Sequence, residues 1–215
     1  ALATMWVTTW LPHASRLVIS NPAELNYAIE RVVTYLASLG IIAIPVLAVT
    51  GPELMSLVFG QAFEAAGPPF VILMVAAVTL GVSGTISAAV IAYEGDSKFS
   101  SAVCIAGLVA VVVTLVMVPY LGAVGAAMGA LAAEIAILAL MNRQYRVLSG
   151  RKIHVPSGRL LVIAALAAGP ALLTILVHGS GSPNVAMVVG LPGWLLAASL
   201  ALRSGHARQD GGGFV

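Results

Sequence analysis

The sequence is poor in charged residues and in cysteine. Only 8% of its 215 residues are Asp, Glu, Lys or Arg, whereas 60% are hydrophobic. A soluble domain carries about a quarter charged residues, so this chain lacks the charge needed to cover a surface that faces water. The single cysteine, Cys104, excludes an intrachain disulfide, and we expect it to be a small packing residue in an apolar segment. We infer that lipid surrounds most of the side chains.

Long apolar runs occupy most of the chain. Six of them approach the roughly 20 residues that a helix needs to cross the hydrocarbon core of a bilayer. They cover Val32–Thr50, Phe70–Ala92, Ser101–Val118, Gly122–Met141, Leu160–His178 and Val185–Leu202. Strands of a membrane barrel are about half that length and alternate in polarity, which these runs do not. We predict an all-α, polytopic transmembrane helix bundle with about six full spans.

The first apolar stretch is different, because it ends at Leu11 and is too short to span a membrane. It also lacks the basic start and the small-residue cleavage site of a signal peptide. We therefore expect the chain to begin inside a truncated first helix and to be the C-terminal part of a longer protein.

The Lys and Arg residues fall in every second gap between the apolar runs, and the intervening gaps contain none. In chain order they are Arg16 and Arg31, then Lys98, then Arg143, Arg146, Arg151, Lys152 and Arg159, and finally Arg203 and Arg208. Cytoplasmic loops of membrane proteins retain Lys and Arg. The alternation therefore predicts a multi-pass protein of the plasma membrane, with the basic gaps and the C-terminus in the cytoplasm.

The connections between the runs carry helix start and stop signals. Asn21 followed by Pro22 and Glu24 predicts the start of a helix. A second signal, from Thr50 to Glu53, predicts a separate short outer helix that ends at Gly60. The uncharged segment from Pro119 to Gly122 predicts a tight turn.

Glu134 is the one acid well inside a predicted span. Ionisable groups are costly there and are often functional. Two interpretations stay open for Glu134. Its carboxyl hydrogen-bonds to a neighbouring helix or reaches the inner interface, or it takes part in ion coupling or substrate contact.

Two further patterns concern helix packing and the basic segment. Gly125 and Gly129 are spaced four apart, which lets two helix backbones approach closely. The basic segment after Met141 determines topology, or it docks anionic lipid head groups or a lipid-linked phosphate. The candidate lipid contacts are Arg143, Arg146, Arg151 and Lys152.

The sequence contains no catalytic constellation and no metal-ligand spacing, so we expect neither an enzyme, a cofactor nor a metal. We also expect no nucleic-acid partner. A membrane-embedded glycan polymerase would need a sizeable outer loop with basic residues, and the outer gaps are short and hold none.

Several segments, in order, resemble the C-terminal half of polysaccharide-exporting flippases. This family belongs to the superfamily that also contains the multidrug and toxin extrusion transporters. Glu134 follows the last segment at the distance of a frequent Ser/Ala-Glu pair of the family. The segments are Leu11–Arg16 (LPHASR), Phe59–Ala66 (FGQAFEAA), Gly95–Lys98 (GDSK) and Pro119–Ala127 (PYLGAVGAA).

The resemblance implies two six-helix lobes followed by a terminal helix pair. Residues 1–142 would be the C-terminal lobe, 143–159 a basic cytoplasmic loop, 160–202 two extra helices and 203–215 a disordered tail. It also implies the cargo, an oligosaccharide on a polyprenyl diphosphate, flipped across the membrane by alternating access. Arg16 would lie near the cytoplasmic mouth, where it contacts the diphosphate or only fixes orientation. The expected partners are membrane lipid, this cargo and the N-terminal lobe.

The sequence also leaves other functions open. A multidrug exporter or a flippase for the peptidoglycan precursor would share the fold. A membrane-embedded glycan polymerase and a scaffold subunit belong to other classes.

Overall fold

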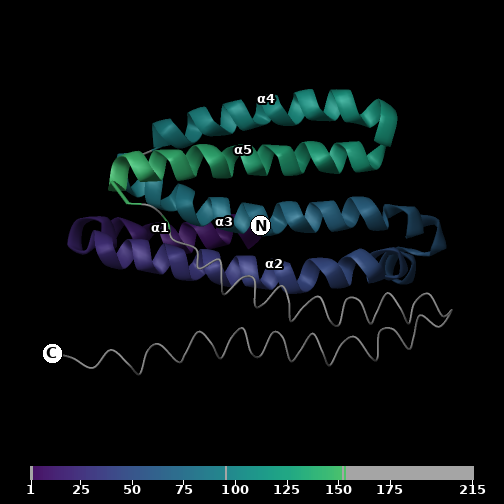
Figure 1. Cartoon of the computed structure of the whole chain (residues 1–215), viewed down its shortest axis with the longest axis horizontal. Helices are drawn as coiled ribbons and strands as arrows, with labels where there is room; N and C mark the ends of the chain where they lie inside the picture. Colours follow the sequence, from purple (N-terminus) through teal and green to yellow (C-terminus); the bar gives the residue numbers. More distant parts are fainter. Residues whose placement is uncertain (1, 95, 152, 154–215) are drawn as a thin grey trace, which may run out of the picture. The chain divides into compact units, whose positions relative to one another are not determined.

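The computed structural model describes residues 2–94, 96–151 and 153, and this part of the chain is almost entirely helical (Figure 1). The all-α prediction is confirmed. The α-helices are α1 (Leu2–Ser20), α2 (Pro22–Phe59), α3 (Gly67–Glu94), α4 (Asp96–Leu121) and α5 (Ala123–Ser149), and a 3₁₀ helix, η1 (Gln61–Ala66), joins α2 to α3.

Four stretches of the described residues are long and apolar enough to cross a membrane. They are Pro22–Phe59, Gln61–Tyr93, Ser97–Leu121 and Ala123–Ser149. These correspond to the first four of the six predicted spans. The last two predicted spans, Leu160–His178 and Val185–Leu202, lie outside the described residues. The fold defines an α-helical membrane protein.

The described residues belong to two compact units. The first combines residues 2–37 with 68–94, 96–151 and 153, and the second contains residues 38–67. Helix α2 therefore starts in the first unit and continues into the second. Both Glu134 and the described basic residues lie in the first unit.

Three predicted helix boundaries are confirmed. At the start of α2, the Glu24 backbone N–H donates to Asn21 Oδ1 (3.3 Å), and the Asn21 side-chain amide donates back to Glu24 Oε2 (3.4 Å). Helix α2 ends at Phe59, and Gly60 follows with φ 97°. Gly122 separates α4 from α5 with φ 54°, although α4 continues through Pro119 to Leu121, so the turn is shorter than the predicted segment. Glycine adopts these positive φ angles without a steric penalty, so it suits both turns.

The prediction of a separate helix start after Thr50 is wrong, because α2 continues through Gly51 and Pro52. The Thr50 hydroxyl donates to the Val46 carbonyl within the helix (2.9 Å), so it is not available as a cap. Proline is tolerated inside membrane helices, where other groups satisfy the freed carbonyl. A Cβ on Gly67 would lie 2.7 Å from Pro52 Cγ, so glycine permits this close approach within the second unit.

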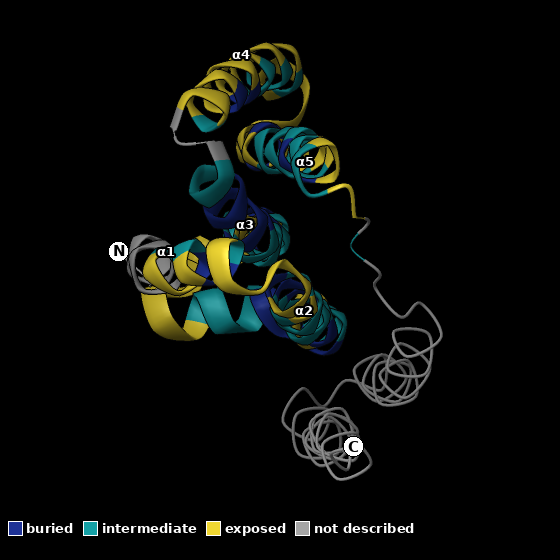
Figure 2. Cartoon of the chain, turned by 90° about the vertical axis from the view of Figure 1, so that its left-hand side faces the viewer, coloured by how far each residue is buried: buried dark blue, intermediate teal, exposed yellow. Residues whose placement is uncertain are grey.

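The core of the first unit lies toward one end, where all five α-helices contribute buried side chains (Figure 2). This end, called the basic end below, includes the α1–α2 junction at Asn21 and the end of α5 at Ser149. Tyr145 and Met141 of α5 are completely buried there against Leu25 and Ile29 of α2. Helices in a membrane associate mainly through van der Waals packing and interhelical hydrogen bonds. Packing is therefore an important source of cohesion at the basic end.

Helices α4 and α5 form a close antiparallel pair, and the small residues Gly125 and Gly129 lie where the two helices meet. A Cβ on Gly125 would lie 2.5 Å from the backbone carbon of Met117 on α4, and a Cβ on Gly129 would overlap the Thr114 hydroxyl. Side chains at these two positions would push the helices apart. The packing interpretation of the Gly125–Gly129 pair is confirmed.

The other face of α4 is apolar and exposed. Leu108, Val112 and Leu115 are 66%, 52% and 69% exposed. Such a face is unfavourable in water and suits the hydrocarbon of a bilayer. Cys104 lies among these exposed residues of α4, so the expectation of a small packing residue is wrong at this position.

We predict that Gly125→Ala in the full-length protein lowers the free energy of unfolding by about 1–3 kcal/mol, because the added methyl group meets backbone that cannot move aside. The matched control is Gly107→Ala on α4, where an added Cβ meets nothing within 4 Å. Thermal unfolding in detergent measures both variants. Equal stability of the two would contradict the close α4–α5 packing.

Candidate functional site

Glu134 lies near the middle of α5, and its carboxyl contacts the middle of α3. Ser83 Oγ lies 3.2 Å from Glu134 Oε2, and the two residues are 51 positions apart in the sequence. Ser83 is completely buried, whereas Glu134 is partly buried. Of the two interpretations of Glu134, hydrogen bonding to a neighbouring helix is therefore present. This contact does not decide whether Glu134 also takes part in transport.

The turns of α3 around Ser83 are rich in buried hydroxyl groups. Thr85 and Ser87 are 0% and 2% exposed. Thr85 donates to the Gly81 carbonyl (2.8 Å) and Ser87 to the Ser83 carbonyl (2.7 Å), both within α3. A hydroxyl group that donates to a carbonyl of its own helix has its hydrogen bonded even inside an apolar bundle. The Ser83 hydroxyl also reaches Glu134 on α5.

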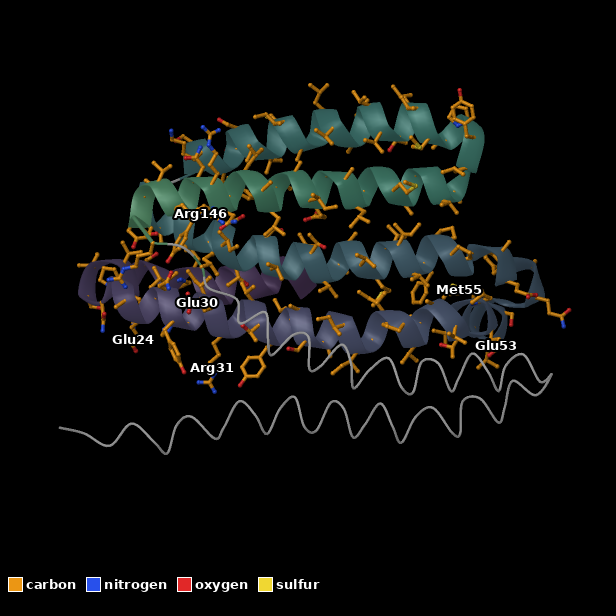
Figure 3. All side chains as sticks on the ribbon, in the orientation of Figure 1. Glu24, Glu30, Arg31, Glu53, Met55 and Arg146 are labelled. Carbon is orange, nitrogen blue, oxygen red and sulfur yellow. The ribbon has the colours of Figure 1, made fainter. Side chains whose placement is uncertain are left out.

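Most of the described basic residues lie near helix ends at the basic end of the first unit, and Figure 3 labels Arg146 at the same end of the view as Glu24 and Glu30. Arg16, Lys98, Arg143 and Arg146 are exposed there. Arg143 and Arg146 are helical rather than part of a loop, because α5 extends to Ser149, beyond the Met141 limit of the predicted span. Lys152 lies outside the described residues.

The end of α5 is fixed by a glycine cap. Gly150 has φ 65°, and its N–H donates to the Arg146 carbonyl (3.1 Å). The Arg151 N–H then donates to Ser149 Oγ (3.2 Å). This cap places Arg151, which is exposed, directly beyond the last turn that carries Arg146. Three of the four predicted lipid contacts thus lie within nine residues at the basic end.

The sequence interpretation missed a polar connection at the basic end. The buried Tyr145 donates its hydroxyl to Asn26 Oδ1 (3.2 Å), and the Asn26 side-chain amide donates to Glu30 Oε1 (2.9 Å). The Tyr145 ring also meets the Tyr93 ring edge to face, with centroids 6.4 Å apart. These contacts join α2, α3 and α5. Asn26 and Tyr145 are 119 positions apart, and no local pattern in the sequence indicates their pairing.

The structure does not combine Arg16 and Glu134 into one site. Arg16 precedes Leu17, which packs in the core at the basic end. Glu134 lies eleven residues before Tyr145, or about 16 Å along α5 from that core. Among the described residues, no three His, Cys, Asp or Glu side chains form a group that could hold a metal ion. The geometry therefore gives two separate places, a polar contact in mid-bundle and a basic surface at one end.

The fold and these contacts define the class, an α-helical membrane protein whose described basic residues gather at one end. Comparison with known proteins adds no closer assignment, because no family model, no curated protein and no solved structure matches the chain.

We predict that Tyr145→Phe lowers the free energy of unfolding by about 1 kcal/mol, because the hydrogen bond to Asn26 is lost. Tyr145→Ala also removes the buried ring and should cost about 3–5 kcal/mol. Tyr120→Phe is the matched control, since Tyr120 is 82% exposed. Thermal unfolding of the full-length protein checks the order of the three variants. A Tyr145→Phe variant as stable as Tyr120→Phe would contradict the polar connection.

Proposed function

We propose that this chain is the C-terminal half of a flippase that moves oligosaccharides on polyprenyl diphosphate across the plasma membrane. The observation that carries the proposal is the order of the family-like segments together with their positions at helix ends. Phe59–Ala66 covers the end of α2 and η1, and Pro119–Ala127 covers the turn between α4 and α5. Leu11–Arg16 lies in the last part of α1.

These positions support the resemblance for a physical reason. Apolar stretches rich in Gly, Ala, Val and Leu match many membrane helices by composition alone, so a match inside a span carries little information. Turns need particular residues, and the glycines at 60 and 122 adopt positive φ angles. Segments whose order and turn positions both fit a flippase lobe are therefore more informative than similar composition.

The distribution of charge fits the cargo that the resemblance implies. A lipid-linked diphosphate is an anion, and it would approach from the cytoplasmic leaflet. Under the positive-inside rule the basic end faces the cytoplasm. Arg16 would lie near this entrance. The candidate contacts to anionic lipid head groups would be Arg143, Arg146, Arg151 and Lys152.

In the proposed protein, an N-terminal lobe completes the cavity, and the two lobes rock between inward-open and outward-open states. Alternating access of this kind is typical of transporters that contain repeated helical lobes. Pro45 lies inside α2 and removes a backbone hydrogen bond there, which gives that helix a point of flexibility. The chain described here would supply one lobe only, so it should not transport by itself.

We predict that disruption of the gene makes the lipid-linked oligosaccharide accumulate on the cytoplasmic leaflet. The cause would be loss of the step that carries the diphosphate and sugar head group across the apolar core. The measurement is cleavage of the oligosaccharide by a glycosidase that cannot enter spheroplasts. The accumulated oligosaccharide should be protected in intact spheroplasts and cleaved after they are opened.

Other outcomes would identify the competing functions. Single oligosaccharide units that accumulate but are cleaved in intact spheroplasts would indicate a glycan polymerase, because the flipping step would still operate. Unchanged lipid-linked oligosaccharide with increased sensitivity to toxic compounds would indicate a multidrug exporter. Accumulation of the peptidoglycan precursor would indicate a flippase for that cargo. Each of these results would contradict the proposed function.

A further inference from the structure

The hydrogen bonds between Ser83 and Glu134 depend on whether the carboxyl carries a proton. The Ser83 hydroxyl has one hydrogen, but two oxygens lie 3.2 Å from Oγ, the Leu80 carbonyl oxygen and Glu134 Oε2. An ionised carboxylate only accepts hydrogen bonds, so it competes with the Leu80 carbonyl for that single hydrogen. A protonated carboxyl instead donates to Ser83 Oγ, and the serine hydrogen then goes to Leu80. The same atoms thus make two hydrogen bonds with the neutral acid and one with the carboxylate.

The helices that surround Glu134 offer no nearby positive charge in the described part of the chain. Helix α3 contains no Lys, Arg or His, and α4 contains only Lys98, at its start. The first basic residue on α5 is Arg143, about 13 Å from Glu134 along the helix axis. On α2, the Arg31 guanidinium lies over the Tyr35 ring at 5.7 Å. An ionised Glu134 would therefore lack a charged partner among these groups.

The other described titratable groups of α3, α4 and α5 lie on an exposed face or near a helix end, and α2 carries Glu24, Tyr27, Glu30, Tyr35 and Glu53 besides Arg31. Cys104 and Tyr120 are exposed on α4. Tyr93 and Tyr145 contact each other at the basic end, and Glu94 ends α3. The described polar neighbour of Glu134 is the Ser83 hydroxyl. A carboxylate in such a place inside a membrane costs more free energy than a protonated carboxyl group that is hydrogen-bonded.

We propose that Ser83 and Glu134 form a proton-binding site between α3 and α5. With the two helices in contact, Glu134 is the neutral acid and donates to Ser83 Oγ. When this contact opens, water replaces Ser83, the O–H bond at the carboxyl breaks and the proton passes to water, which leaves a carboxylate. The reverse step forms the O–H bond again and restores both hydrogen bonds.

The consequence of this site for transport rests on the proposed function. If the α3–α5 contact opens and closes during the transport cycle, each cycle takes up and releases one proton at Glu134. A proton gradient would then bias the direction in which the cargo moves. The coupling follows because the ligand, here the proton, binds the two arrangements of the helices with different affinity.

A metal cation is a poorer occupant of the same place. Hard cations such as Ca²⁺ take about six or more oxygen ligands. The contact between Ser83 and Glu134 offers one carboxyl group and one hydroxyl, which is well below that number of oxygen ligands. A proton needs only the carboxyl oxygen and one acceptor.

Infrared spectroscopy of the full-length protein in lipid vesicles tests the site without relying on transport. The wild-type protein at neutral pH should show the C=O stretching band of a protonated carboxyl group, and Glu134→Gln should lose it. Glu64→Gln is the matched control, because Glu64 is exposed, and it should keep the band. Ser83→Ala should keep the band at a higher frequency, because the carboxyl loses its acceptor. The proposal is overturned if the wild type lacks the band, if Glu134→Gln retains it, or if Ser83→Ala leaves its frequency unchanged.

A flipping assay with the same vesicles tests the consequence for transport. An imposed pH gradient should stimulate flipping by the wild type and by Glu64→Gln, and this stimulation should be lost in Glu134→Gln. Stimulation by a sodium gradient but not by a pH gradient would overturn proton coupling, and so would stimulation that persists in Glu134→Gln. If the wild type flips no lipid-linked oligosaccharide at all, the proposed function fails. The infrared result still decides the proton-binding site in that case.

Discussion

The exclusion of charge and of unpaired backbone groups from hydrocarbon is the constraint on which the rest of this structure depends. A chain with 8% charged residues cannot cover a water-facing surface, and in lipid it must satisfy its backbone within helices. Four long apolar stretches of the described residues meet that condition. Exposed aliphatic side chains such as Leu108 and Leu115 on α4 then face a solvent that suits them. The polar side chains are left with two places, the helix ends and the inside of the bundle.

In the first unit, polar side chains lie both at the helix ends and inside the bundle. At the basic end, apolar packing around Tyr145 and Met141 coincides with the exposed arginines and with the hydrogen bonds through Asn26. In mid-bundle, the polar groups are small hydroxyls that bond to their own helix, with one carboxyl reaching across from α5. The basic end therefore combines apolar packing with hydrogen bonds between helices at the predicted cytoplasmic face. In mid-bundle, Ser83 and Glu134 join α3 to α5 through one pair of side chains.

Local features of the fold could be predicted from the sequence, because each depends on residues close together in the chain. The apolar runs predicted the spans, and Asn21, Gly60 and Gly122 marked helix boundaries that the structure confirms. The Gly125–Gly129 spacing predicted close packing, although not that α4 is the partner. The continuation of α2 through Pro52 was missed, because the same cap signal starts helices in water and is overridden where the backbone has no water to bond to. The pairing of Glu134 with Ser83 depends on tertiary structure, so the sequence could indicate Glu134 as a candidate but not its partner.

The most direct test of the central claim is the accessibility of two ends of the first unit in intact cells. Single cysteines replace Ser20, at the basic end, and Tyr120, near the opposite end of α4, in a protein in which Cys104 is changed to serine. A maleimide that cannot cross membranes should label position 120 in intact cells, and position 20 only after the cells are permeabilised. Labelling of position 20 in intact cells, or equal labelling of both positions, would contradict an oriented bundle whose basic end faces the cytoplasm.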